Sequence, residues 1–477
     1  MAAPLLPEIL LAIVGMAFLM IGVFVGDKAA KPLTYAVALA LIGAFVVAVL
    51  APAGPAFSGL FVADKLSTFA KALIAIGVAA TALMAAGRVA PADGSGPMRF
   101  EQPVLMLFAA IGMMLMVSAN DLMSLYVGLE LQSLALYVLA AIRRDSLRAT
   151  EAGLKYFVLG ALSSGMLLYG AGLIYGYTGA TGFDAIAERI VAMGTPSVGL
   201  IIGIVFLLAG LAFKVSAAPF HMWTPDVYEG ADTPITAFFA AAPKAAALAL
   251  FARVMADPLA GAADAWGQIV ATIAALSVVI GAFGALAQRN IKRLMAYSSI
   301  GHVGFALIGL AAASEAGVRG LLIYTAIYLF MNLAAFACVM AMRRDGAAVE
   351  SIDDLAGASR THPFMAAALA AVLFSMAGIP PLAGFFGKFA VLTAAVDAEL
   401  YILAVIGVVA SVVSCFYYIR LIKIMYFDEA TDALDGPMAR DLSVVLGLAT
   451  AVILLFIVIP GPIVTEATAA AQELFQR

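Results

Sequence analysis

Charged residues are scarce in this sequence: they make up 12% of its 477 residues, whereas hydrophobic residues make up 64%. Soluble domains contain about 25% charged residues, so this composition excludes a soluble globular protein. The net charge is −4, and lysine and arginine occur singly or in short clusters. Because nucleic-acid binding requires a basic stripe or patch, a nucleic-acid partner is also excluded.

Cysteine is rarer still. Cys338 and Cys415 are the only two, and each lies inside an apolar run far from the other. They cannot form a CxxC zinc site, an iron–sulfur site or a disulfide framework. Any redox cofactor that works with this chain is therefore expected in another chain. The first apolar run also lacks a preceding positive charge, so we interpret it as a spanning helix and not as a signal peptide.

Long apolar runs fill the rest of the sequence, and the mean hydropathy is +1.07. A spanning helix needs about 20 mostly apolar residues. Fourteen stretches of this kind are present, which predicts an all-α polytopic membrane protein. They are centred near residues 15, 41, 74, 109, 131, 165, 207, 245, 276, 301, 330, 375, 413 and 452.

The distribution of basic residues predicts the orientation of these spans. Sixteen of the 26 lysines and arginines, Arg88 among them, fall in odd-numbered connections. Five, including Arg477, fall in even-numbered connections or at the termini, and the other five lie inside spans. Because loops on the inner side of a membrane carry the excess of basic residues, both termini are expected on the outer side.

Helix-breaking residues interrupt two of the spans. Pro219 follows Lys214 in span seven, and Pro380 and Pro381 precede Lys388 in span twelve. Paired interruptions of this kind indicate an inverted-repeat transporter with discontinuous helices. We predict two inverted five-helix repeats, made of spans 4–8 and 9–13. The expected division is an N-terminal three-helix segment (1–99), a first repeat (100–256), a second repeat (257–427) and a C-terminal helix (428–477).

Four ionisable residues are expected deep in the membrane. Glu130 lies nine residues after Asp121, the polar start of span five, and a helical rise of 1.5 Å per residue places it roughly 14 Å deep. Lys214, Lys244 and Lys388 are each flanked by apolar sequence. Each buried lysine costs about 2.5–3.5 kcal/mol, and an apolar residue would pack better. We therefore interpret the four as a proton path, against the alternative of a buried ion pair that fixes helix register.

Three further residues are possible relays. His221 lies beside the break in span seven, and His302 lies mid-span beside two serines, where an imidazole can take up and release protons. Lys155 fits either the path or an interfacial ion pair with Glu151, four residues earlier.

The other residues that stand out receive no role in the path. Lys71 lies near a span end and is expected to snorkel to the interface. Trp223, Tyr228 and Glu229 are expected at the interface as well, in the connection between spans seven and eight, and His362 is assigned no role.

Several segments resemble a known family. Residues 213–247, FKVSAAPFHMWTPDVYEGADTPITAFFAAAPKAA, resemble the signature of the antiporter-like subunits of respiratory NADH:quinone oxidoreductase, complex I. The VYEGA and APK variants are closest to the N-type subunit, which is subunit 2 in mitochondria. LELQSLALYVL, YSSIGHVGF and GIPPLAGFFGKF add matches in spans five, ten and twelve. The resemblance extends over essentially the whole chain.

The resemblance implies a non-redox subunit of a proton-translocating enzyme complex. Glu130, Lys214, Lys244 and Lys388 match the family's proton-translocating positions, and Lys155 matches its additional span-six lysine. The chain itself would carry no cofactor, because NADH oxidation, flavin, iron–sulfur clusters and quinone reduction belong to partner subunits. The implied neighbours are the related M-type subunit on one flank and a small membrane subunit on the other, in a bacterial inner membrane.

Three other functions compete with this interpretation. A subunit of a multi-subunit sodium/proton antiporter shares the repeat, the breaks and the lysines, but the VYEGA and APK variants disfavour it. A purely structural membrane spacer would not need lysines in the membrane. No motif of a single-chain solute transporter is present.

Overall fold

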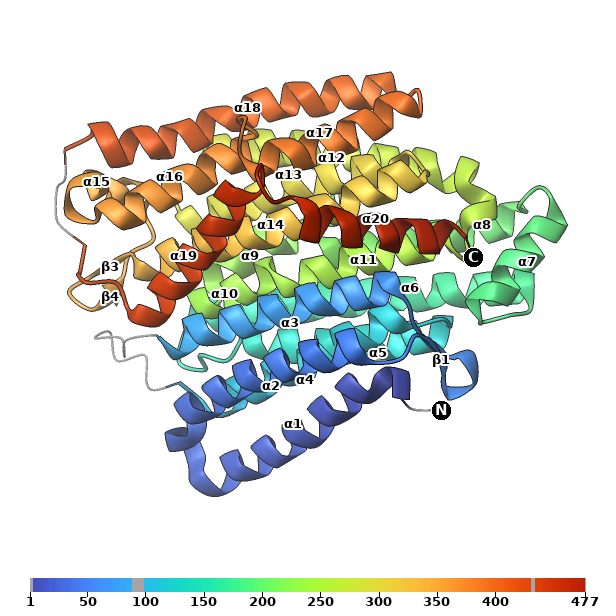
Figure 1. Ribbon diagram of the computed structural model, residues 1–477, viewed down its shortest axis with the longest axis horizontal. Helices are drawn as coiled ribbons and strands as arrows, with labels where there is room; N and C mark the ends of the chain where they lie inside the picture. The colour runs from blue at the N-terminus through green and yellow to red at the C-terminus, as the bar shows by residue number, and fades with distance from the viewer. Residues whose placement is uncertain (1–2, 88–97, 430–433, 477) are drawn as a thin grey trace.

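The structure is a computed structural model that describes residues 3–87, 98–429 and 434–476 (Figure 1). Arg88 and Arg477, which enter the count of basic residues above, lie outside these ranges. Most of the described chain forms helices that run along one common direction, and both ends of the chain lie at the same end of the molecule (Figure 1).

The elements follow one another along the chain with short connections. The first eight helices are α1 (Leu6–Val25), α2 (Ala30–Leu50), α3 (Lys65–Ala86), α4 (Glu101–Ser118), α5 (Leu122–Ala140), α6 (Leu147–Thr178), α7 (Phe183–Met193) and α8 (Val198–Val215). The next six are α9 (Trp223–Gly230), α10 (Thr233–Ala240), α11 (Ala242–Ala256), α12 (Ala263–Leu286), α13 (Ile291–Ala311) and α14 (Glu315–Ala341). The last six are α15 (Ala358–Thr361), α16 (Pro363–Ala377), α17 (Ala383–Asp397), α18 (Tyr401–Phe427), α19 (Arg440–Leu455) and α20 (Gly461–Phe475). Two small antiparallel hairpins pair β1 (Gly54–Ala56) with β2 (Phe61–Ala63) and β3 (Arg343–Arg344) with β4 (Ala347–Ala348).

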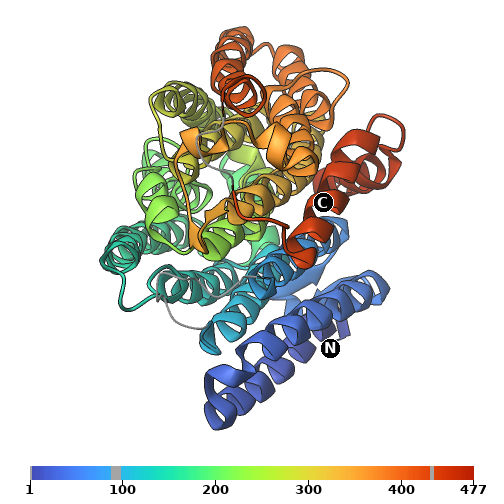
Figure 2. The same cartoon turned by 90° about the vertical axis from the view of Figure 1, so that its left-hand side faces the viewer.

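Length and apolar composition identify the membrane-crossing helices. Among the described residues, 11 segments are long and apolar enough to cross a membrane, and the first of them, Ala3–Leu50, contains both α1 and α2. The segments that hold α10–α11, α13 and α14 are almost completely buried inside the protein. The α1–α2 pair is mostly exposed and lies at one edge of the bundle (Figure 2). The chain is therefore a polytopic helical membrane protein built around buried central helices.

The interruptions predicted at the prolines are present. Helix α8 ends at Val215, where Ser216 takes the left-handed conformation (φ 66°), and α9 begins only at Trp223. Helix α16 ends at Ala377 before Gly378 (φ 87°), and α17 begins at Ala383. Proline cannot donate a backbone hydrogen bond and clashes with the preceding helical turn, so neither helix continues through its break.

A further interruption, between α10 and α11, was not expected from the sequence. Ala241 leaves the helical conformation (φ −102°, ψ −97°) directly before the helix restarts, and Pro243 occupies the first turn of α11. Proline is favoured there because its missing N–H is not needed in a first turn. Lys244 therefore lies at the start of a helix and not in the middle of one.

Two buried ion pairs correct the sequence interpretation, in which Lys71 snorkels and Arg253 belongs to a connection between spans. Lys71 does not snorkel: it is 2% exposed, and its Nζ lies 2.7 Å from Oε1 of Glu8. This ion pair could not be predicted because Glu8 is distant from Lys71 in the sequence. Glu8 lies on α1, which contacts α3 only in the folded protein. Arg253 of α11 similarly pairs with Asp64 at 2.7 Å, before the start of α3.

The C-terminal segment also differs from the single helix expected there. It contains α19 and then α20, which packs against α3 and α14. The second helix begins after Pro460, with Pro462 in its first turn, where proline is favoured because its missing N–H is not needed.

Candidate functional site

The expected pair of Glu130 and Lys214 is brought together by α5 and α8. Their closest oxygen and nitrogen, Oε1 and Nζ, lie 3.9 Å apart, with side chains 22% and 5% exposed. Ser164 of α6 bridges them: its hydroxyl donates to Glu130 and accepts from Lys214 at 3.3 Å. The ammonium therefore has one carboxylate and a shell of hydroxyls around it.

Two more hydroxyls complete the surroundings of Lys214. Its Nζ donates to Ser133 Oγ at 2.7 Å and to the Tyr137 hydroxyl at 3.2 Å. Sequence reasoning did not select these residues. Their spacing from Glu130, three and seven residues along α5, places all three on one helical face and is the signal that could have identified them.

A line of aromatic rings leads from Lys214 towards the helix before Lys244. The Tyr137 ring meets Tyr156 edge-on at 4.8 Å, and Tyr156 stacks on Trp223 at 4.3 Å. Tyr156 also contacts Phe239 of α10 at 5.7 Å. Trp223, 3% exposed, and Tyr228, fully buried, therefore belong to the core of the protein and do not lie on its surface.

Lys244 is buried without a carboxylate partner within the described residues. Its Nζ donates to the hydroxyl of Ser299 on α13 and lies 5.3 Å from the centre of the Tyr228 ring. Lys388 of α17 is similar: its Nζ donates to the carbonyl oxygen of Ala377 at 3.0 Å and to Ser411 Oγ at 2.8 Å. The Ala377 carbonyl is left without its helical partner by the break after α16, so the break supplies a ligand for the ammonium.

His302 lies on α13, the helix that also contacts both of these lysines. Ser299, which binds Lys244, precedes it by three residues, and Phe305, whose ring centre lies 4.8 Å from Lys388 Nζ, follows it by three. His221 lies in the irregular segment between α8 and α9. Within the described residues, no side-chain hydrogen bond or ion pair joins His221 to the buried lysines.

Lys155 occupies a different environment, at the molecular surface. Its Nζ lies 2.8 Å from both Glu151 and Asp226, and its side chain is 42% exposed. Arg293 of α13 holds the other carboxylate oxygen of Asp226 at 2.7 Å. Partial burial acts to raise the pKa of Asp226, but the hydrogen bonds from Lys155 and Arg293 outweigh it and hold that pKa below its usual value. The interfacial ion pair expected with Glu151 is thus present, within a larger surface network.

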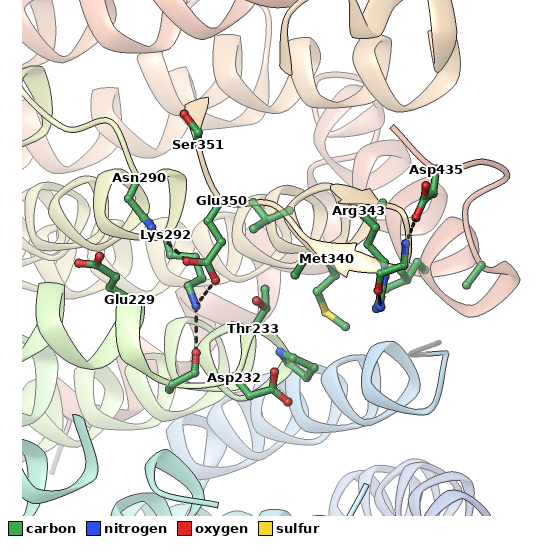
Figure 3. A pocket seen from close by; sticks show the side chains of 18 of the residues that line it. Glu229, Asp232, Thr233, Asn290, Lys292, Met340, Arg343, Glu350, Ser351 and Asp435 are labelled. Atoms are coloured by element: carbon green, nitrogen blue, oxygen red, sulfur yellow. Dashed lines mark hydrogen bonds and ion pairs between the residues drawn. The ribbon is translucent and has the colours of Figure 1, made fainter. Parts of the chain in front are cut away.

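A cavity of about 730 Å³ opens near the β3–β4 hairpin, at the end of the molecule away from the two chain ends (Figures 1 and 3). Its lining includes basic and acidic side chains, among them Lys292, Arg343, Glu229 and Glu350. Lys292 lies at the cavity with Nζ 2.7 Å from Glu350 and 3.0 Å from the carbonyl oxygen of Ala231, just after α9 (Figure 3). Among the described residues, no cluster of three or more histidine, cysteine or acidic residues could hold a metal ion.

Comparison with known proteins identifies the family. The model of the NADH:quinone oxidoreductase/Mrp antiporter transmembrane family matches residues 119–414. NADH-quinone oxidoreductase subunit N of Rhodospirillum rubrum is 58% identical over 481 residues, which cover 99% of this chain and 97% of that protein. This chain belongs to the NADH:quinone oxidoreductase/Mrp antiporter transmembrane family. The subunit N of Paramagnetospirillum magneticum is 56% identical over 480 residues, covering 99% of this chain and 98% of that protein. The resemblance to N-type subunits is confirmed.

Solved structures of the family share the fold. A chain of respiratory complex I from Thermus thermophilus superposes with a TM-score of 0.82 at 33% identity, covering 97% of this chain and 100% of that one. A chain of the Mrp complex from a Dietzia species superposes with a TM-score of 0.86, covering 100% of this chain and 98% of that one. Its identity is 21%, so this second likeness concerns the fold alone.

Proposed function

We propose that this chain is the proton-translocating N-type membrane subunit of an NADH:quinone oxidoreductase. The observation that carries the proposal is the series of buried lysines Lys214, Lys244 and Lys388, with the half-buried Glu130 beside the first, in a chain 58% identical to a protein named subunit N of this enzyme. Burying an ammonium group in an apolar core is costly. A series of such groups surrounded by hydroxyls is what a proton path through a membrane requires.

Separation of Glu130 from Lys214 is the step that starts proton movement in this proposal. At 3.9 Å, with Ser164 between them, the two charges attract each other without a direct hydrogen bond. Moving or neutralising the carboxylate leaves the ammonium with hydroxyl partners only, which favours release of its proton towards Lys244. Lys244, His302 and Lys388 then carry the proton onward, and His221 is a secondary candidate. Lys155, which is held in the surface ion pairs with Glu151 and Asp226, is assigned no step in the path.

The redox chemistry of the proposed complex belongs to other chains. NADH oxidation, flavin, iron–sulfur clusters and quinone reduction are assigned to partner subunits, and this chain is a non-redox part of the translocase. The proposed neighbours are an M-type subunit on one flank and a small membrane subunit on the other, in a bacterial inner membrane.

The helix order supports the proposed fourteen spans and their repeats. Spans one to three are α1 to α3, spans four to seven are α4, α5, α6 and α8, and span eight is α10 with α11. Spans nine to eleven are α12 to α14, span twelve is α16 with α17, span thirteen is α18 and span fourteen is α19 with α20, which together run from the β3–β4 end to the C-terminus (Figure 1). The two repeats, residues 100–256 and 257–427, then begin at α4 and α12 and end with α11 and α18.

The cavity is proposed to face the inner side, with both termini outside. In a chain without Cys338 and Cys415, a cysteine in place of Ser351, which lines the cavity, should react with a membrane-impermeant thiol reagent only from the inside. A cysteine in place of Ser58, which is exposed in the β1–β2 turn near the chain ends, should react only from the outside. Reaction of Ser351→Cys from the outside would reverse the proposed orientation.

Purification of the tagged chain in mild detergent tests the function. NADH-dependent quinone reduction should co-purify with it in a large multi-subunit assembly. A small assembly with sodium-driven, NADH-independent proton exchange would instead support the antiporter subunit, which is favoured by the shared fold and by a family model that covers both classes of protein. The buried lysines would keep their roles in that case, but the driving force would change.

A further inference from the structure

Hydroxyl groups from two other helices hold both ring nitrogens of His302. Its Nδ1 lies 2.6 Å from the hydroxyl of Tyr324 on α14, and its Nε2 lies 3.0 Å from the hydroxyl of Tyr418 on α18. The Tyr418 hydroxyl also lies 2.6 Å from Oγ of Ser298, one turn before His302 on α13. All four side chains are buried. The result is a continuous hydrogen-bonded chain: Ser298, Tyr418, His302, Tyr324.

Each end of this chain is linked to one of the two lysines through one intervening residue. Ser298 is next to Ser299, which accepts a hydrogen bond from Lys244. At the other end the Tyr324 ring stacks on Phe305 at 6.2 Å, and Lys388 Nζ lies on the Phe305 ring. A lysine ammonium is carried by a flexible four-carbon stem, so small movements can bring it to a neighbouring hydroxyl.

Hydrogen counting gives the two tyrosines opposite roles at the imidazole ring. A neutral imidazole has one N–H donor and one bare nitrogen, so one tyrosine accepts from the ring while the other donates to it. When a proton passes through, the O–H bond of the donating tyrosine breaks as a new N–H forms on the bare nitrogen. The old N–H breaks on the far side, and its proton moves to the second tyrosine. The donating tyrosine regains a proton from its outer neighbour, and the receiving tyrosine gives its original proton to the neighbour on its other side, so no net charge remains on the ring or the phenols. The outer neighbour is Ser298 for Tyr418, and for Tyr324 it is Lys388 once the lysine stem has moved to the hydroxyl.

No other polar contact of the imidazole exists within the described residues. No hydrogen bond or ion pair joins it to a lysine or a carboxylate there, and its remaining close neighbour is the Tyr328 ring at 4.9 Å. A proton that uses His302 must therefore cross a tyrosine hydroxyl on each side. Building on the function proposed above, we propose that Tyr418 and Tyr324 are proton-carrying residues that connect His302 to Lys244 and Lys388.

The variant Tyr418→Phe tests this role because it removes one hydroxyl and keeps the ring that packs on Tyr417 at 4.4 Å. In the intact complex, NADH-driven proton pumping should fall by roughly tenfold or more, since a positioned proton-transfer group is lost. Tyr297→Phe is the matched control: it lies on α13, and its hydroxyl makes no hydrogen bond within the described residues. It should pump like the unmodified protein, and complex abundance should be unchanged in both variants.

A double variant separates proton transfer from packing. If Tyr418 and His302 serve one relay, Tyr418→Phe combined with His302→Gln should pump no worse than His302→Gln alone. Independent structural defects would multiply instead, and that result would overturn the proposal. Unchanged pumping by Tyr418→Phe would overturn it too. Lys214→Met, measured alongside, distinguishes the two proposals: if it stops pumping while Tyr418→Phe does not, only the tyrosine relay fails.

Discussion

Replacing Lys214 with methionine is expected to lower NADH-driven proton pumping by roughly a hundredfold, the scale at which loss of a positioned proton-transfer group slows a reaction. Methionine fills similar space but cannot hold a proton. The substitution removes the partner of Glu130 and the donor to Ser133 and Tyr137. Proton release should be measured in sealed vesicles that contain the whole complex, with its abundance determined on native gels.

Lys155→Met is the control for that experiment. Lys155 is also a lysine with carboxylate partners, but its side chain is 42% exposed and its ion pairs lie at the surface. Exposed ion pairs contribute about 0–1 kcal/mol, so this change should leave pumping within roughly twofold of the unmodified complex. If Lys214→Met pumps normally in an assembled complex, Lys214 is not on the path. If Lys155→Met stops pumping, the surface network around Asp226 has a role that the geometry does not suggest.

The parts of the site that could be predicted from the sequence are those that conflict with their surroundings. Lys214, Lys244 and Lys388 stand out because each is a charge within an apolar run, and Pro219 and Pro380 stand out because they interrupt helices. The structure confirms that the three lysines are buried and that both helices break. A residue whose position costs free energy, such as a charge inside an apolar helix, can be recognised from a single sequence without any knowledge of its neighbours.

The parts that could not be predicted depend on contacts between helices distant in sequence. Tyr324 and Tyr418 are ordinary residues of apolar helices, and only the packing of α13 between α14 and α18 places their hydroxyls on His302. Lys71 was misjudged for the same reason, since its partner lies on another helix. The interruption before Lys244 was missed because a proline in a first helical turn is compatible with a continuous span until the preceding residue is seen.

Lys244→Met should abolish pumping while leaving the protein as stable as before, or more so. Within the described residues Lys244 has no carboxylate partner, only the Ser299 hydroxyl and the Tyr228 ring. Methionine therefore leaves no buried counter-ion behind, whereas Lys214→Met leaves Glu130 without its cation. We expect pumping to fall roughly a hundredfold. The thermal unfolding temperature of the purified complex should stay constant or rise.

Measuring both the proton pumping and the unfolding temperature of Lys244→Met separates a functional residue from a structural one. Placing a lysine at this depth costs about 2.5–3.5 kcal/mol of free energy, which an apolar residue avoids. If Lys244 served only for packing, its replacement by methionine would therefore stabilise the protein and leave pumping unchanged. Normal pumping by Lys244→Met would remove Lys244 from the path. A lower unfolding temperature would show that its contacts with Ser299 and Tyr228 stabilise the fold. Loss of pumping without loss of stability is the result expected of a residue retained for the protons it carries.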